Sequence, residues 1–172
     1  MKIVSRQECE DWLRLKHVHG FTWEALKAHY AHCITYELPS DTGRKTALSR
    51  VVIGSIPTWE QGLLWITDWS IFPSSENMAL FDGYRKSLGE SRAIQVAPGH
   101  LFDQVDLIQL ECLLDLALYF YWDVSLFDGA GSIAIKTSHD EYFSIFGGDK
   151  IRLQGFERSL APMKLNIREA RQ

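Results

Sequence analysis

The apolar run from Val105 to Trp122 constrains the fold of this chain more than any other stretch of the sequence. Its hydrophobic residues point in almost every direction around a helical period of about 3.6 residues, and such a helix belongs in a protein core or a membrane. Asp106, Glu111 and Asp115 interrupt the run, whereas a membrane span needs about 20 largely uncharged residues. The run therefore predicts a buried central helix, about 27 Å long, with one exposed edge.

The composition is that of an ordinary globular protein with an acidic balance. The chain has 172 residues, of which 46% are apolar and 23% charged, and its formal net charge is −4. This length fits a single domain over 1–172. The negative charge argues against nucleic-acid binding, which normally uses a basic patch. We expect 1–56 to be mainly helical, 57–146 to form the sheet, and 147–172 to be a basic, partly frayed tail.

The cysteines and the first residues indicate a cytoplasmic protein. Cys9, Cys33 and Cys112 are odd in number and far apart, so their spacing predicts neither a disulfide framework nor a metal site. The segment 1–10 lacks the apolar core of a signal peptide. We therefore expect free thiols, a cytoplasmic location, no metal and no membrane association.

Hydrophobic patterns, caps and turn residues predict alternating helices and strands. A capping box at Ser5 and Glu8 marks the first helix, and a similar box at Ser138 and Glu141 predicts a helix after it. The β-branched stretch 51–53 fits either the end of a helix or a short strand. The other expected helices are 23–32, 41–53, 76–88 and 105–122, and the expected strands are 33–38, 63–69, 93–97, 124–128 and 132–138.

The order of these elements predicts the topology. Strand, helix, strand, helix, strand over 63–128 is typical of two βαβ units, so the three strands should be parallel with right-handed crossovers. The strand 132–138 then adds an antiparallel hairpin around Gly129 and Gly131. We expect an α/β fold, or α+β if 93–97 is irregular, with a mixed sheet of about four to five strands and helices packed around the central helix.

A first group of candidate site residues follows from this topology, because ligands favour the carboxyl ends of parallel strands. That edge would carry Asp68, Trp69, Glu76 and His100. His100 precedes the predicted central helix, where a neutral imidazole is favoured, although such a histidine also commonly ties a turn together. Arg85 is expected on the exposed side of its helix, facing either an anionic partner or only solvent.

A second group of polar residues is expected at the opposite edge, separated from the first by most of the ~27 Å central helix. It consists of Asp123, His139, Asp140 and Glu141. Adjacent His and carboxylate residues do not chelate a metal on a helix, and the capping box alone accounts for Glu141. The chain has no nucleophile elbow, phosphate loop or zinc-binding helix motif, so we expect neither a cofactor nor a catalytic residue.

Several short motifs resemble those of a family of uncharacterised bacterial proteins, over roughly residues 60–145. The matching elements are W-x-x-F-P-S-S-E-N at 69–77, Arg85, P-G-H-L-F at 98–102, W-D at 122–123 and S-H-D-E-Y at 138–142. The resemblance implies a bacterial protein without an established activity, and it draws attention to Glu76, Arg85, His100 and His139. In type alone, without a shared motif, the chain is similar to immunity proteins that neutralise toxins.

These observations favour a non-enzymatic binding protein. Its acidic, aromatic-bearing face would recognise a basic protein partner, as in an immunity or adaptor protein. The alternative is a small-ligand binder, or an enzyme of unknown class, that uses the edge with Asp68, Glu76 and His100. A third interpretation is that both polar groups only cap helices.

Overall fold

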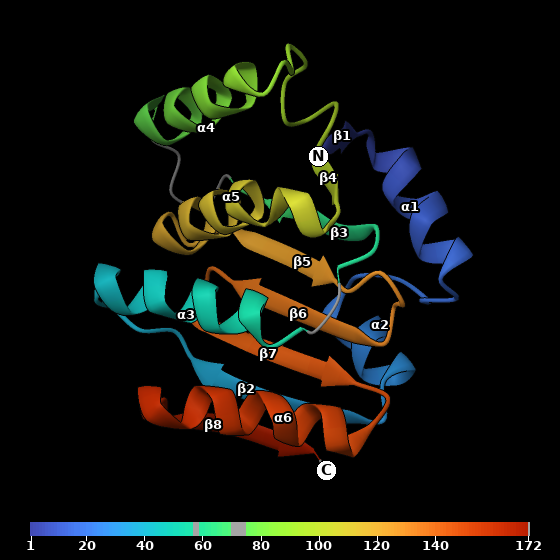
Figure 1. Ribbon diagram of the computed structural model, residues 1–172, viewed down its shortest axis with the longest axis vertical. Coiled ribbons are helices and arrows are strands. Elements are labelled where there is room, and N and C mark those ends of the chain that lie inside the picture. Colours follow the sequence, from blue (N-terminus) through green and yellow to red (C-terminus); the bar gives the residue numbers. More distant parts are fainter. Residues whose placement is uncertain (57–58, 70–74, 172) are drawn as a thin grey trace.

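The computed structural model describes residues 1–56, 59–69 and 75–171, without the side chains of residues 75–77, 170 and 171. Within these residues, eight strands form one sheet in the order β1-β4-β3-β5-β6-β7-β2-β8 (Figure 1). Every neighbouring pair in this sheet is antiparallel. The strands are β1 (Lys2–Val4), β2 (His32–Glu37), β3 (Gly62–Asp68), β4 (Gly99–Phe102), β5 (Asp123–Phe127), β6 (Ile133–Ser138), β7 (Tyr142–Gly147) and β8 (Ile167–Arg171).

The prediction of a mixed sheet of about four to five strands is wrong, because the sheet is larger and its neighbouring strands are antiparallel. The expected strand at 93–97 is a turn, in which the Ala97 N–H donates to the Ala93 carbonyl (3.1 Å). The next strand, β4, begins with Gly99 opposite Trp65, close to the end of β3. The chain therefore leaves and re-enters the sheet at the same end, and the helix between β3 and β4 is an insertion in an antiparallel connection.

Part of the predicted crossover is nevertheless present. β4 and β5 flank β3 and both pair with it antiparallel, so these two strands run in the same direction. The central helix connects them across β3 (Figure 1). The helix and the second strand of the predicted unit are thus present, but its first strand is β4 in place of 93–97, and β3 lies between the two parallel strands.

Helices cover both faces of the sheet. Figure 1 shows α3, α5 and α6 in front of the sheet and α1 and α2 behind it, with α4 at the top of the view. Side chains from α3 to α6 share one hydrophobic core, and those from α1 and α2 belong to a second core. The helices are α1 (Arg6–Leu15), α2 (Trp23–His29), α3 (Thr42–Gly54), α4 (Ser75–Ser87), α5 (Leu107–Tyr119) and α6 (Lys150–Leu160).

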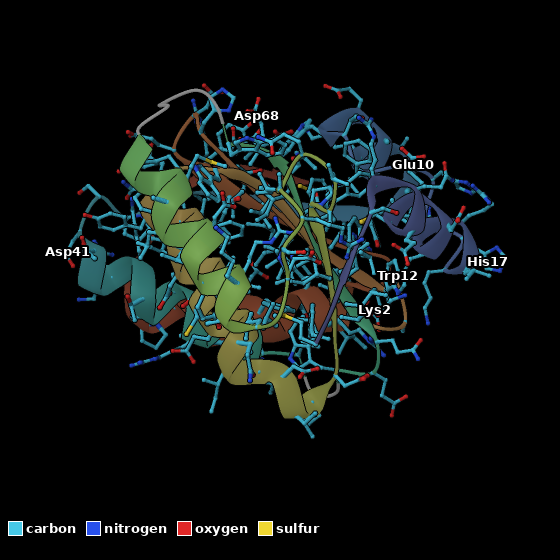
Figure 2. All side chains as sticks on the ribbon, turned by 90° about the horizontal axis from the view of Figure 1, so that it is seen from above. Lys2, Glu10, Trp12, His17, Asp41 and Asp68 are labelled. Atoms are coloured by element: carbon cyan, nitrogen blue, oxygen red, sulfur yellow. The ribbon has the colours of Figure 1, made fainter. Side chains whose placement is uncertain are left out.

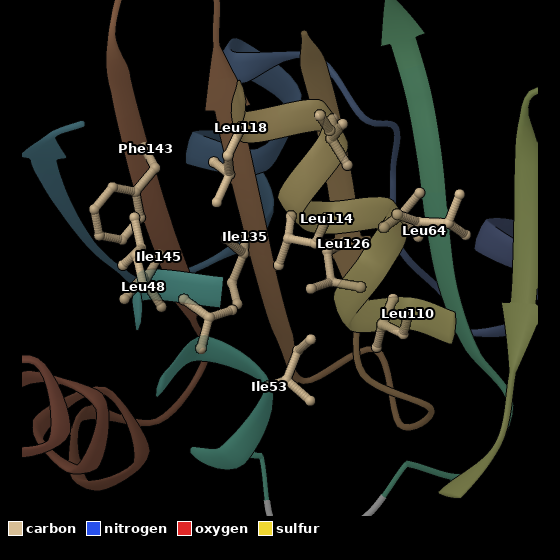
Figure 3. Close-up of a cluster of buried hydrophobic side chains, with 14 of the residues drawn as sticks. Leu48, Ile53, Leu64, Leu110, Leu114, Leu118, Leu126, Ile135, Phe143 and Ile145 are labelled. Carbon is tan, nitrogen blue, oxygen red and sulfur yellow. The ribbon is translucent and has the colours of Figure 1, made fainter. Parts of the chain in front are cut away.

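The central helix α5 is shorter and more one-sided than its sequence predicts. Its buried residues recur at helical spacing on a single face, which packs on the sheet (Figure 3). On the other face, Ile108 is 77% exposed and Tyr119 is 53% exposed. An apolar sequence all round the helix therefore does not mean burial all round, because the sheet covers one side. The buried residues are Leu110, Leu113, Leu114, Ala117 and Leu118.

The segment after Ser138 is a tight turn and a strand, where a helix was predicted. The Glu141 N–H donates to the Ser138 carbonyl (3.1 Å), and Glu141 has a φ of 62°. Tyr142–Gly147 then forms β7, because alternate residues such as Phe143 and Ile145 enter the larger core. A Ser-x-x-Glu sequence fits a hairpin turn as well as a helix start.

Both ends of the chain join the sheet, which extends beyond 57–146. β1 pairs with β4 at one edge, and β8 pairs with β2 at the other. The tail is further attached by an ion pair between Glu169 Oε1 and Lys27 Nζ (2.7 Å). In the part of the chain that the structure describes, no helix is both long and apolar enough to cross a membrane.

We expect Gly129→Ala to destabilise the protein by about 2–3 kcal/mol, because an added methyl group overpacks a site closed by backbone. A Cβ on Gly129 would lie 1.6 Å from the carbonyl oxygen of Glu60. Urea denaturation measures the effect. Gly155→Ala in α6 is the matched control, since its Cβ meets no atom within 4 Å. The control should be neutral or stabilising by about 0.5–1 kcal/mol, and equal effects of both changes would contradict the prediction.

Candidate functional site

The antiparallel register brings Asp68, from the first predicted polar group, next to the second group at one end of the sheet. Asp68, at the end of β3, lies opposite Asp123, at the start of β5, beside an irregularity in the register. The Thr67 hydroxyl donates to the Asp123 carbonyl (3.2 Å) across the same strands. Asp68 is at the surface of the molecule in Figure 2. The predicted separation by the length of the central helix is therefore wrong, because it assumed parallel strands.

The turn between β6 and β7 completes this cluster. One carboxylate oxygen of Asp123 accepts a hydrogen bond from the His139 backbone N–H (2.8 Å). The same oxygen is 2.9 Å from Nδ1 of the His139 ring. Nε2 of the same ring is 3.6 Å from Asp140 Oδ1. The Asp140 side chain is 64% exposed, whereas that of Asp123 is 18% exposed. Asp123 thus fixes the turn, and Asp140 presents its charge to solvent.

We define the acidic end of the sheet as Asp68, Asp123, Asp140 and Glu141. All four carry carboxylates, and Asp140 and Glu141 are exposed. A cation that binds among these carboxylates gains a favourable interaction. The arrangement is therefore suited to binding a positively charged group.

A row of polar side chains crosses the sheet next to the acidic end, on the face covered by α1 and α2. The Thr35 and Ser144 hydroxyl oxygens are 2.8 Å apart, and the Ser125 hydroxyl donates to the Phe21 carbonyl (3.4 Å). These hydrogen bonds satisfy hydroxyl groups that are otherwise buried. Sequence reasoning missed this row, because Ser144 lies in β7, where a helix was predicted, although the other three members lie in predicted strands. In cross-strand register they are Ser125, Lys136, Ser144 and Thr35.

Lys136 is the one cation of this row. Burial lowers the pKa of its ammonium group, and the nearby carboxylates of Asp123 and Glu24 oppose that shift. The Lys136 ammonium group thus attracts the Asp123 carboxylate electrostatically. Asp140 and Glu141 therefore remain the outward charges of the acidic end.

Aromatic side chains stand beside these charges. The ring of Trp23 meets that of Tyr142 edge to face, with centroids 5.4 Å apart. The Arg168 guanidinium lies over the Tyr142 ring, 5.2 Å from its centroid. Trp69 is partly buried, packs on the larger core and lines a small cleft of about 130 Å³. The acidic end thus has aromatic neighbours of the kind enriched at binding surfaces.

Arg85 and His100 lie away from the acidic end, between α4 and the sheet. Arg85 was expected on the exposed side of its helix but is 1% exposed, and its Nη2 donates to the Ala97 carbonyl (2.6 Å). His100 was expected in a turn but lies within β4 and has no exposed surface. The ring of Phe81 approaches His100 edge to face. Glu76 falls in α4, and its side chain is outside the described residues.

This buried pair has unsatisfied nitrogens. Nε and Nη1 of Arg85, and both ring nitrogens of His100, are buried without a hydrogen-bond partner. Burial, and then the Arg85 charge, lower the pKa of His100 to about 3. Burial also lowers the pKa of Arg85, while Glu90 and Asp82 oppose that shift. The imidazole is therefore neutral at physiological pH.

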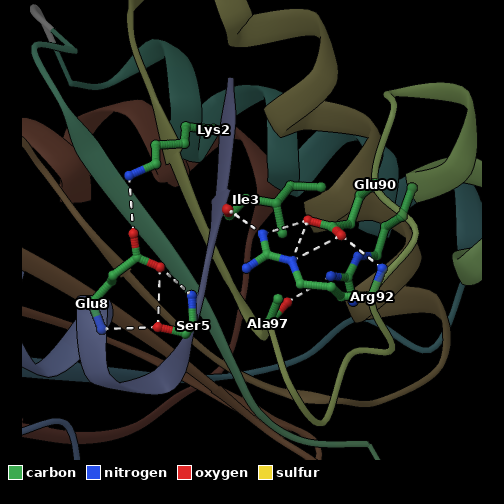
Figure 4. A network of polar contacts seen from close by, with 8 residues as sticks. Lys2, Ile3, Ser5, Glu8, Glu90, Arg92 and Ala97 are labelled. Carbon is green, nitrogen blue, oxygen red and sulfur yellow. Dashed lines mark hydrogen bonds and ion pairs between the residues drawn. The ribbon is translucent and has the colours of Figure 1, made fainter.

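Glu90 faces this cluster but is engaged elsewhere. Arg92 Nη2 lies 2.6 Å from Glu90 Oε2 and 2.8 Å from the Ile3 carbonyl (Figure 4). The hydrogen bonds from Arg92 lower the pKa of Glu90 to about 2. The Glu90 carboxylate thus links the connection after α4 to β1 through Arg92, instead of pairing directly with Arg85.

The described residues contain no group of three or more His, Cys, Asp or Glu side chains that could hold a metal ion. Comparisons of the chain with protein-family models, curated proteins and solved structures find no match. The resemblance to a bacterial family therefore stays a prediction.

We expect Asp123→Ala to lower the free energy of unfolding by about 1–2 kcal/mol, because the buried N–H of His139 loses its acceptor. Chemical denaturation measures this change. Asp140→Ala, one residue beyond His139, is the control and should stay within about 0.5 kcal/mol, since its side chain is exposed. A loss as large for Asp140→Ala as for Asp123→Ala would contradict the assignment of Asp123 as the residue that fixes the turn.

The buried, neutral His100 predicts a pH dependence of stability. The unfolded chain binds a proton at this residue below a pH of about 6.5, whereas the folded protein does so only near pH 3. Stability therefore falls as the pH falls through this window, with a contribution from His100 that approaches about 1.4 kcal/mol per pH unit. Denaturation between pH 7 and pH 4 should show a shallower dependence for His100→Gln. A pH dependence for His100→Gln as steep as that of the wild type would contradict this assignment.

Proposed function

We propose that this protein is a non-enzymatic binding protein whose acidic end recognises a basic protein partner. The observation that carries the proposal is the meeting of Asp68 and Asp123 across β3 and β5, beside the turn with Asp140 and Glu141. Four carboxylates from three chain segments converge, so the charge is a property of the fold. An acidic surface accelerates encounters with a basic partner and favours it over an acidic one.

The aromatic neighbours of the acidic end offer apolar contacts, which charged groups alone do not provide. Exposed ion pairs contribute about 0–1 kcal/mol each, so a stable complex also needs apolar contacts. Trp23, Tyr142 and Trp69 are partly exposed and offer such contacts near the carboxylates. This combination supports recognition of a protein surface with basic and apolar residues. An immunity or adaptor role is consistent with such a surface.

The alternative of a small-ligand site that joins Asp68 and His100 has less support. His100 is fully buried under α4, whereas Asp68 belongs to the acidic end. The cleft beside Trp69 has a volume of about 130 Å³, while small-molecule sites usually occupy about 300–1,000 Å³. Among the described residues, Asp68 and His100 therefore lie at different places and do not line this cleft together.

Affinity capture from a lysate of the native host tests the proposal. We expect the wild-type protein to retain one basic partner in stoichiometric amount, and Asp140→Lys to lose it because the change reverses an exposed charge of the acidic end. Retention should weaken between about 0.05 M and 0.5 M salt, where screening shortens the range of the interaction.

Glu60→Lys is the matched control, because it makes the same change of charge at an exposed position near the other end of the sheet. This variant should retain the partner. The proposal fails if no stoichiometric partner is recovered, or if Asp140→Lys and Glu60→Lys retain it equally well.

A further inference from the structure

Two adjoining cavities lie at the end of the sheet opposite the acidic end. The first has a volume of about 410 Å³ and is lined by charged residues that include Lys16, Glu60 and Asp103. The second, of about 210 Å³, is lined by apolar residues that include Ile133 and Phe156. Asp128 and Arg152 line both cavities, so the polar and apolar spaces share a boundary.

Asp128 is already engaged in holding the turn between β5 and β6. Its carboxylate accepts hydrogen bonds from the N–H and hydroxyl groups of Ser132 (both 2.7 Å) and from the N–H of Ile133 (3.0 Å). Arg152 Nη1 donates to the Ser132 hydroxyl (2.6 Å) and is 3.7 Å from Asp128. These bonds hold Asp128 and Arg152 in place where the two cavities adjoin and leave the other guanidinium nitrogens of Arg152 able to donate to a ligand.

Opposite charges remain in the first cavity. Within the described residues, the side chains of Glu60 and Lys16 form no ion pair with one another or with a neighbour, and Lys16 lies 5.7 Å from the Trp12 ring centroid. Asp103 uses Oδ1 to accept a hydrogen bond from the Gln61 N–H (2.8 Å). Lys16 and Glu60 therefore offer a cation and a carboxylate that are not neutralised by direct pairing within the described residues.

The rim of this cavity has a strained backbone. Gln61 has a φ of 55°, a left-handed conformation that is unfavourable for a residue other than glycine. The bond to Asp103 and a bond from Trp12 Nε1 to the Gln61 carbonyl (3.0 Å) hold it there. Strain that is maintained by such bonds is a recurrent feature of ligand sites.

We propose that the paired cavities bind a small zwitterion, an α-amino acid with an apolar side chain. Its carboxylate would be held by Lys16 and Arg152, its ammonium group by Glu60 and Asp103, and its side chain in the cavity with Ile133 and Phe156. A ligand with only one charge would leave one set of side chains uncompensated. The volume of the first cavity lies within the range of about 300–1,000 Å³ that is typical of ligand sites.

This site is independent of the proposed partner surface. β5 runs from the acidic end to the cavities over five residues, Asp123–Phe127, which corresponds to about 17 Å at roughly 3.3 Å per residue. The charged residues of the cavities differ from those of the acidic end. A failure of partner capture would therefore not affect this proposal, nor would a failure here affect the proposed function.

Isothermal titration with free L-leucine, up to about 10 mM, tests the proposal on the intact protein. We expect saturable binding, which weakens by at least roughly tenfold for glycine, 4-methylpentanoate and isoamylamine. Glycine lacks the apolar side chain, 4-methylpentanoate lacks the ammonium group, and isoamylamine lacks the carboxylate. The three analogues thus test the three parts of the site separately.

Variants locate the binding. Glu60→Gln and Lys16→Met keep the size of each side chain and should each weaken leucine binding by at least roughly tenfold. Asp140→Asn, at the acidic end, removes one negative charge and should bind leucine like the wild type. Absence of saturable binding overturns the proposal, as does binding that these substitutions in the cavity leave unchanged.

Discussion

The antiparallel pairing of β3 with both β4 and β5 is the constraint on which the rest of the molecule depends. β3 lies between two strands that run in the same direction, and α5 crosses over it to connect them. Its alternate residues supply both hydrophobic cores, with Leu64 in one and Leu63 in the other. The same register sets Asp68 against Asp123. One pairing thus determines the path of the central helix and the composition of the acidic end.

The local parts of this fold could be predicted from the sequence, because their determinants lie within a few residues. The Ser5 capping box starts α1 as predicted, and Gly129–Gly131 marks the turn between β5 and β6. The direction of β4 could not be predicted in this way, because it depends on where the chain re-enters the sheet after α4. The turn at Ser138 was misread because one capping pattern suits two structures.

The candidate sites also depend on long-range pairing that the sequence does not reveal. The sequence identified Asp68, Asp123 and His139 as polar residues at the ends of strands, and their joint position required the register. Arg85 was assigned to an exposed face because it follows Tyr84, a residue of the predicted apolar face, by one position in the helix. The cavities near Asp128 were not predicted because they are lined by residues that directly follow α1, β4 and β5, together with residues of α6. A site that is assembled from distant segments cannot be recognised from a local sequence pattern.

The unsatisfied nitrogens of Arg85 and His100 destabilise the packing of α4 on the sheet. Buried donors and acceptors without partners cost free energy, and movement of α4 away from β4 would let water reach Arg85 and His100. The hydration gained in that step offsets part of the apolar contact that is lost. Local opening of α4 is therefore cheaper than opening of α5, whose buried face is entirely apolar. The amide hydrogens of α4 should accordingly exchange with solvent well before those of the central helix.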